Sequence, residues 1–164
     1  MKPIFFYGSL RDRDLLQIVL DHEVPAGEFL AAEAPDMHTV QLATEAYPVL
    51  VPAPGRVAAG MALISPSAED VARLEYFEEA EYGLGDLDIR TQDGWISAQF
   101  FRGTGKALET DLPWDYTFWR LNERPVALRA AREYMSYYGH LTIEEVDQIW
   151  PDIIARARTL RAAG

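Results

Sequence analysis

Cysteine is missing from the sequence, which excludes disulfide bonds, thiolate metal ligands and a cysteine nucleophile. The three histidines, His22, His38 and His140, stand apart without the spacing of a metal site, so each is expected to be a surface or loop residue. No apolar run is long enough to cross a bilayer, and Met1-Lys2 leads directly into a strand rather than into a secretory signal. We therefore expect a cytoplasmic protein without a metal site or a membrane segment.

Basic residues are also scarce. The 26 aspartates and glutamates outnumber the 15 lysines and arginines, which gives a formal net charge of -11 at pH 7. Such a charge opposes the phosphate backbone of nucleic acids and anionic membrane surfaces, so neither is an expected partner. In contrast, 49% of the residues are hydrophobic, which is enough to build one buried core in a single domain of 164 residues.

Short segments with strand character dominate the first 102 residues. Strands are expected at 3–6, 28–31, 37–43, 47–52, 57–64, 87–91 and 95–101, and Asp93-Gly94 predicts a type I′ turn between the last two. Pro48 and Pro52 lack a ladder N–H and should lie at strand edges or ends. Helices are expected only at 12–21 and after Ser67. This pattern predicts an α+β fold, a small mixed β-barrel of five to seven strands with flanking helices.

Residues 103–164 have a different character. A glycine-containing turn precedes an aromatic segment at 112–119, and two helices follow. Pro125 predicts the start of the first helix, and Thr142-Ile-Glu-Glu145 is a capping box that opens the second, which Pro151 should kink or divide. We expect this helical C-terminal extension to pack on the barrel core of residues 1–102 within one domain, with aromatic faces that allow a homodimer.

The first expected strand runs directly into Tyr7-Gly8-Ser9-Leu10. A glycine permits close backbone approach, and a turn at a strand end presents N–H groups and a hydroxyl at one place. This segment can therefore cradle an anionic or carbonyl-bearing small molecule. By themselves, the same residues most often form an ordinary turn.

A second candidate lies in the acidic segment 67–82, where Ser67 can cap the start of a helix. A helical wheel places Glu78 on the apolar face, where a carboxylate is costly unless it is paired. Loss of water would make it easier to protonate near neutral pH, as a general acid or base requires. Two alternatives stay open: Glu78 reaches water at the helix end, or it pairs with Arg73 or Arg90.

Four segments in order resemble one known family. They are Tyr7-Gly8-Ser9-Leu10, Tyr47-Pro48-Val49-Leu50-Val51-Pro52, Gly60, and the stretch 74–82 with the sequence Leu-Glu-Tyr-Phe-Glu-Glu-Ala-Glu-Tyr. Together they resemble the gamma-glutamylcyclotransferase-like superfamily, in particular its branch of plant avirulence-induced-gene-like proteins. The sequence departs from the commonest pattern by carrying Glu75 in place of aspartate and Glu79 in place of glycine.

The resemblance implies a barrel with its active site at one mouth, and it requires no metal or cofactor. Glu78 matches the catalytic glutamate, and the backbone of Tyr7-Gly8-Ser9-Leu10 would hold the γ-glutamyl portion of a small-molecule substrate. Tyr82 matches an aromatic residue that either orients the substrate or packs in the core. The implied reaction converts a γ-glutamyl amine or γ-glutamyl amino acid to 5-oxoproline and the free amine, with Glu78 as general acid and base.

Two other functions are compatible with the same residues. The first is a non-catalytic small-molecule binding or protein-interaction module that keeps the barrel scaffold, because a buried acid can also bind an amine cation. The second is an enzyme that cleaves another kind of amide, since a fold does not by itself fix a substrate.

Overall fold

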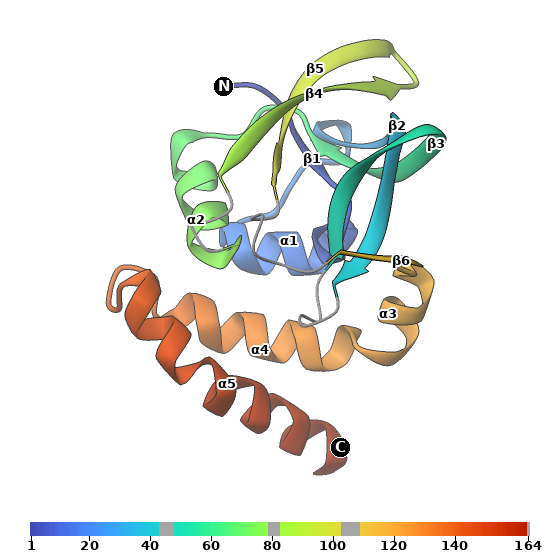
Figure 1. Cartoon of the computed structure of the whole chain (residues 1–164). Helices are drawn as coiled ribbons and strands as arrows, with labels where there is room; N and C mark the ends of the chain where they lie inside the picture. The colour runs from blue at the N-terminus through green and yellow to red at the C-terminus, as the bar shows by residue number, and fades with distance from the viewer. Residues whose placement is uncertain (43–47, 79–82, 103–108, 164) are drawn as a thin grey trace.

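The computed structural model describes residues 1–42, 48–78, 83–102 and 109–163. Figure 1 shows strands gathered in a barrel with helices beneath them. The strands are β1 (Ile4–Phe6), β2 (Phe29–Leu42), β3 (Pro48–Leu63), β4 (Leu84–Thr91), β5 (Gly94–Phe101) and β6 (Glu109–Pro113). The helices are α1 (Arg13–Leu20), α2 (Ala68–Glu78), α3 (Tyr116–Asn122), α4 (Arg124–Ser136) and α5 (Ile143–Ala163), with short 3-10 turns at Ser9–Arg11 and Ala26–Glu28.

The sheet closes on itself. Its order is β3-β1-β5-β4-β2, and a further pairing of β3 with β2 joins the two ends, while β6 adds to the outer side of β2. The β1–β5 pair is parallel, and the other pairs are antiparallel. The prediction of an α+β fold built on a small mixed barrel is confirmed.

Alternation along the strands divides the apolar side chains between two clusters. The interior of the barrel holds mostly small residues around two phenylalanines, namely Phe5, Ala32, Ala34, Leu50, Ala58, Ala62, Ile89, Ala98 and Phe100. Gly60 is required there, because a Cβ at this position would lie 2.6 Å from the Phe5 ring and would meet the Phe6 carbonyl oxygen. The interior is therefore packed around one ring that only a glycine can accommodate.

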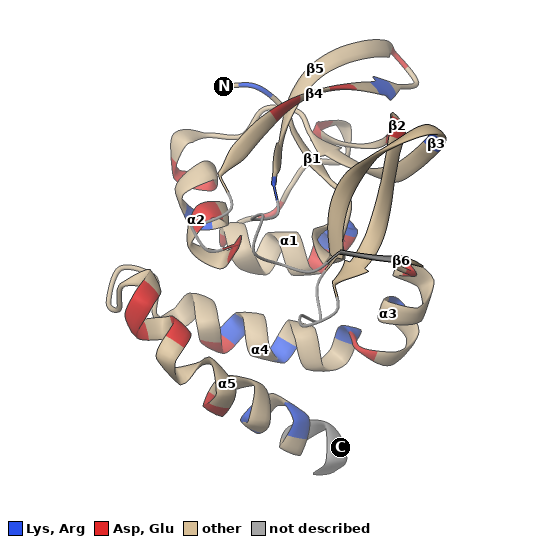
Figure 2. Ribbon diagram, viewed as in Figure 1, with Lys and Arg blue, Asp and Glu red and all other residues tan. Residues whose placement is uncertain are grey.

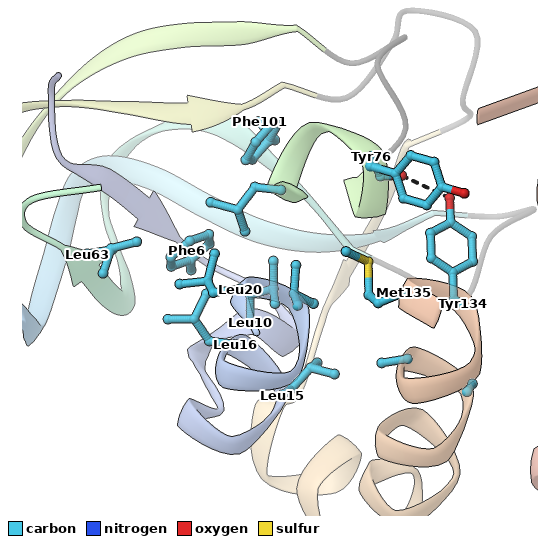
Figure 3. Close-up of a cluster of buried hydrophobic side chains, with 14 of the residues drawn as sticks. Phe6, Leu10, Leu15, Leu16, Leu20, Leu63, Tyr76, Phe101, Tyr134 and Met135 are labelled. Atoms are coloured by element: carbon cyan, nitrogen blue, oxygen red, sulfur yellow. Dashed lines mark hydrogen bonds between the residues drawn. The ribbon is translucent and has the colours of Figure 1, made fainter. Parts of the chain in front are cut away.

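The opposite face of the barrel packs against the helices in a larger cluster. Figure 3 shows Phe6 and Phe101 from the barrel, Leu16 and Leu20 from α1, and Met135 from α4 in this cluster. The Tyr134 hydroxyl of α4 donates a hydrogen bond to the Tyr76 carbonyl oxygen of α2, 2.9 Å away. Residues from both ends of the chain therefore share one buried core.

The four strands expected between residues 28 and 64 are in fact two long strands. Segments 28–31 and 37–43 belong largely to β2, and segments 47–52 and 57–64 belong largely to β3. At the expected break, Asp36 adopts a φ of 60°, and its carboxylate accepts a hydrogen bond from the Gly55 N–H at 2.9 Å. A bulge between Pro35 and Met37 absorbs the irregularity, so pairing resumes beyond it.

Two local predictions were wrong. The β4–β5 hairpin forms where expected, but its two connecting residues are Gln92 and Asp93, and Gly94 alone has a positive φ, of 110°. A type I′ turn needs a positive φ at both central residues, so the turn is of another type. The second error is partial: α5 continues through Pro151, so the alternative of a divided helix is wrong, and the alternative of a kink stays a prediction.

The helix starts follow the sequence closely. Asp12 caps α1 by accepting from the Leu15 N–H, and Thr142 and Glu145 form the predicted capping box of α5. Figure 2 shows that α5 begins with acidic residues and becomes basic towards its end. This order of charges suits the positive start and negative end of a helix.

Candidate functional site

The strand directions bring several candidate residues to one end of the barrel. Since β1 and β5 are parallel, both finish at this end, and β4, which runs against β5, begins there with Leu84 opposite Phe101. The Tyr7-Gly8-Ser9-Leu10 segment leaves β1 at this end. We call it the loop end of the barrel, defined by Phe6, Phe101 and Leu84.

Tyr7 is half-buried and points to the interior side of the barrel, where its ring meets Phe100 edge-on with centroids 6.5 Å apart. Its hydroxyl donates a hydrogen bond to the Phe101 carbonyl oxygen at 2.6 Å. The side chain is therefore fixed at both its ring and its hydroxyl. Any substrate at the loop end would meet a rigid tyrosine.

The next three residues form a tight turn against the barrel. A Cβ on Gly8 would lie 3.0 Å from the Pro48 side chain, so glycine lets the segment approach β3 closely. Ser9 starts a 3-10 turn, and Leu10 is 2% exposed within the large core cluster. The Leu10 side chain thus anchors the segment in the core.

The turn is also held at its exit. Asp12 is buried and forms an ion pair with Arg124 of α4, with Nε and Oδ2 2.6 Å apart. The hydrogen bond to Asp12 raises the pKa of Arg124. The neighbouring Arg11 guanidinium stacks over the Tyr116 ring of α3, 4.1 Å from its centroid, and burial lowers the pKa of Arg11. The helices after the barrel therefore brace the loop from behind.

Glu78 is the last residue of α2 and is half-buried. Leu74, one turn earlier, is fully buried against the large core cluster, whereas Glu75 is exposed as the helical wheel predicts. The two arginines considered as partners are engaged elsewhere, because Arg73 donates to the Val19 carbonyl oxygen and Arg90 pairs with Glu33. Tyr82, the remaining predicted site residue, lies outside the described residues.

The length of the chain between α2 and β4 limits how far Glu78 can lie from the loop end. Five peptide units separate Glu78 from Gly83, so the two Cα atoms lie within about 17 Å of each other. Gly83 itself is at the loop end, because its carbonyl oxygen accepts a hydrogen bond from the Arg102 N–H at 3.0 Å. The approach of the Glu78 carboxylate to the Tyr7-Gly8-Ser9-Leu10 segment stays a prediction.

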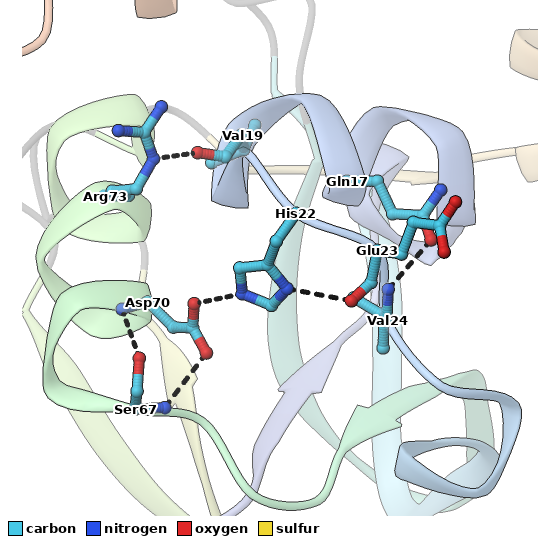
Figure 4. Close-up of polar contacts among 8 residues, drawn as sticks. All are labelled: Gln17, Val19, His22, Glu23, Val24, Ser67, Asp70 and Arg73. Atoms are coloured by element: carbon cyan, nitrogen blue, oxygen red, sulfur yellow. Dashed lines mark hydrogen bonds and ion pairs between the residues drawn. The ribbon is translucent and has the colours of Figure 1, made fainter.

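Sequence reasoning missed a different acid of α2. Asp70 is 6% exposed and accepts hydrogen bonds from the Ser67 N–H at 2.9 Å and from the His22 Nε2 at 2.7 Å, as Figure 4 shows. The Ser67 hydroxyl accepts in turn from the Asp70 N–H. A Ser-x-x-Asp spacing at a helix start signals this cap. Nothing local to the sequence indicates the partnership with His22.

These contacts shift the pKa values of both His22 and Asp70. The backbone carbonyl of Glu23 and the carboxylate of Asp70 together raise the pKa of His22. Burial alone would raise the pKa of Asp70, but the Ser67 N–H and the His22 ring outweigh it and lower this pKa. Because both ring nitrogens of His22 are engaged with these two partners, the pair holds α2 against the end of α1 and does not present a free base.

Two other kinds of feature, metal-binding groups and membrane-spanning helices, are not found among the described residues. Over the described ranges, no group of three or more histidine, aspartate or glutamate side chains is arranged to hold a metal ion. None of the described helices is both long enough and apolar enough to span a membrane.

Comparison with known proteins identifies the family. Residues 4–120 match the model of the family described as gamma-glutamyl cyclotransferase, AIG2-like. The chain belongs to this family. Among curated relatives, it is 27% identical over 93 residues to AIG2-like protein D of Arabidopsis thaliana, covering 57% of the chain and 59% of the relative. It is 28% identical over 90 residues to AIG2-like protein A of the same plant, covering 55% of the chain and 53% of the relative. The match thus spans little more than half the length of these relatives.

Solved structures share the fold. A solution structure from Arabidopsis thaliana matches with a TM-score of 0.58 at 23% identity, over 75% of this chain and 81% of that one. A structure titled gamma-glutamyl cyclotransferase matches with a TM-score of 0.57 at 16% identity, over 92% of this chain and 98% of that one. A match of 92% extends beyond residue 120, so the shared architecture includes part of the C-terminal helical region.

Proposed function

We propose that this protein is a cyclotransferase that converts a γ-glutamyl amine or γ-glutamyl amino acid to 5-oxoproline and the free amine or amino acid. The observation that carries the proposal is the half-buried Glu78 at the end of α2, in a chain of the gamma-glutamyl cyclotransferase, AIG2-like family whose loop after β1 reads Tyr7-Gly8-Ser9-Leu10.

The reaction needs little more than positioning and one proton carrier. A γ-glutamyl compound contains its own nucleophile, the α-amine, which attacks the γ-carbonyl carbon and closes a five-membered ring. The new C–N bond forms as the amine loses a proton, and the old amide C–N bond breaks as the departing nitrogen gains one. Glu78 accepts the first proton as its carboxylate and returns it to the departing nitrogen, so it ends the cycle unchanged.

The rest of the site would supply the geometry. Ring closure requires the glutamyl chain to be bent so that amine and carbonyl meet, and holding reactants in that arrangement lowers the barrier substantially. The Tyr7-Gly8-Ser9-Leu10 backbone is suited to this task, because the buried Leu10 side chain and the Asp12–Arg124 ion pair fix it. Its N–H groups would stabilise the negative charge that develops on the carbonyl oxygen.

The test is incubation of the full chain with a panel of γ-glutamyl compounds, with release of 5-oxoproline as the readout. The native protein should turn over at least one of them, and Glu78→Gln should lower kcat by about 10²- to 10⁴-fold. Glu75→Gln, which changes an exposed acid of the same helix, is the matched control and should leave the rate unchanged. Absence of turnover across the panel would favour a non-catalytic binding module on this scaffold.

A further inference from the structure

Arg102 is a cation at the loop end that the mechanism above does not use. It follows Phe101 directly, and its backbone N–H donates to the Gly83 carbonyl oxygen, so the β4–β5 ladder extends one pair beyond Leu84 and Phe101. Along β5, Ala98 and Phe100 face the barrel interior. Arg102 is the next residue in that alternation, so its side chain leaves the strand on the interior side.

The contacts of its side chain agree with this placement. A Cβ on Gly85 would lie 2.7 Å from the Arg102 Cδ, 2.9 Å from its Cγ and 3.0 Å from the Phe100 ring. The arginine stem therefore lies beside Phe100 in space that Gly85 leaves open. The terminal Nη2 extends towards Gly83, 3.7 Å from the Cβ position there.

This arrangement places the guanidinium among residues of the loop end. Phe100 has the ring of Tyr7 on one side, and the Tyr7 hydroxyl bonds to the carbonyl of Phe101, the residue that precedes Arg102. Gly83, near which the guanidinium ends, is five residues beyond Glu78. Arg102 thus lies at the same end of the barrel as the Tyr7-Gly8-Ser9-Leu10 segment.

No ion pair of the described residues involves the charge at this place. Among the residues that the structure describes, Arg102 takes part in none of the ion pairs, and its side chain is exposed. The protein as a whole carries a net charge of -11, which disfavours anionic substrates. A planar guanidinium with free N–H groups is the side chain best suited to bind a carboxylate through two parallel hydrogen bonds.

We infer that Arg102 determines substrate specificity by binding the carboxylate of the departing amino acid, so that the protein prefers γ-glutamyl amino acids to γ-glutamyl amines. This inference rests on the proposed cyclotransferase function. The glutamyl portion is common to both substrate classes and is assigned to the loop backbone. The departing group is the portion that differs between the two classes. Its carboxylate is the feature that the Arg102 guanidinium at the loop end can bind.

The test compares two substrates that differ only in that carboxylate, γ-glutamyl-alanine and γ-glutamyl-ethylamide. The native protein should favour γ-glutamyl-alanine in kcat/KM by about tenfold, as expected for one charge-assisted contact at an exposed position. Arg102→Gln should remove this preference by raising KM for γ-glutamyl-alanine, with kcat and both constants for the ethylamide unchanged. Arg102→Lys should keep part of the preference, because it retains the charge and loses the paired geometry.

Arg90→Gln is the matched control. Arg90 is also an exposed arginine of the β4–β5 hairpin, but it lies opposite Trp95 near the other end and pairs with Glu33. Its removal should leave the substrate preference unchanged. Equal turnover of both substrates by the native protein would overturn the inference. An equal loss of kcat/KM for both substrates in Arg102→Gln would also overturn it, because the guanidinium would then bind the α-carboxylate that both substrates share.

If the protein is not a cyclotransferase, a binding experiment still tests the role of Arg102. If the native protein turns over neither compound, binding of the two is measured by calorimetry on the native protein and on Arg102→Gln. Tighter binding of γ-glutamyl-alanine that Arg102→Gln abolishes would support the carboxylate site even though the protein is not a cyclotransferase. Equal binding of the two compounds, or binding of neither, would overturn the inference.

Discussion

Each end of α2 carries a carboxylate that is at least partly buried, and the surroundings of the two carboxylates differ. Asp70, near the start, is buried with hydrogen bonds from Ser67 and His22, and it benefits from the positive end of the helix. Glu78, the last residue of α2, is half-buried at the other end of the helix. A carboxylate that caps a helix stabilises the fold, whereas the role proposed for Glu78 is proton transfer.

The sharpest way to test this contrast is to shorten Glu78 by one methylene. Glu78→Asp keeps the charge but withdraws the carboxylate from its position, and a misplacement on the order of 1 Å can cost about 10²-fold in rate. We expect kcat for 5-oxoproline release to fall by about that factor while the thermal unfolding midpoint stays nearly unchanged. An unaltered kcat would show that Glu78 acts only through its charge and is not the proton carrier.

The next effect concerns the stability of the fold. Asp70→Ala removes the acceptor of the Ser67 N–H and the partner of His22, and loss of such a cap costs about 1–3 kcal/mol in the free energy of unfolding. Denaturant titration measures this loss, and Glu75→Ala on the exposed face should change the value by less than about 0.5 kcal/mol. The contrast with Glu78 would fail if Asp70→Ala lowered kcat per folded molecule as strongly as Glu78→Asp does.

The smallest expected effect is a dependence of stability on pH. The pKa of His22 is raised above 6.5, so its contribution is complete below that value and is lost as pH rises through the raised pKa. The pKa of Asp70 is lowered below 3.8, so its contribution is complete above that value and is lost as pH falls through the lowered pKa. The pair should therefore stabilise most between pH 3.8 and 6.5.

The size of this pH effect is limited by solvent. The His22 side chain is 49% exposed, and exposed ion pairs contribute less than about 1 kcal/mol. Unfolding midpoints measured from pH 5 to 8 should decline slightly for the native protein and stay flat for His22→Gln. A decline of equal size in both proteins would assign it to other groups.

Local chemistry in the sequence accounts for much of the observed fold. The strand before Tyr7, the helix capped by Asp12 and the capping box at Thr142 each depend on residues within a few positions of one another. Predictions failed where a long-range contact overrode a local signal. Proline and glycine residues near Asp36 and Gly55 indicated separate strands, but the hydrogen bond between these two residues lets β2 and β3 continue past the bend.

The residues of the candidate site also differ in how far the sequence could predict them. The loop after β1 and Glu78 could be selected from residue types and family resemblance, and their role in the proposed reaction stays a prediction. His22 and Arg102 could not be selected. His22 meets Asp70 across 48 positions of sequence, and the orientation of Arg102 depends on the room that Gly85 leaves on the neighbouring strand. Neither relation produces a periodic or short-range pattern.

The sequence by itself indicated most of the strand and helix segments and where most helices begin, because those properties follow from backbone preferences and hydrophobic spacing. The family resemblance, in turn, singled out Glu78 and the glycine turn after β1 as candidates. Only the tertiary structure decided that β1 and β5 end together, that α4 braces the loop through Arg124, and that Asp70 is the buried acid of α2. Closing a barrel sets residues far apart in the chain against one another, and the resulting contacts depend on three-dimensional packing that no local pattern encodes.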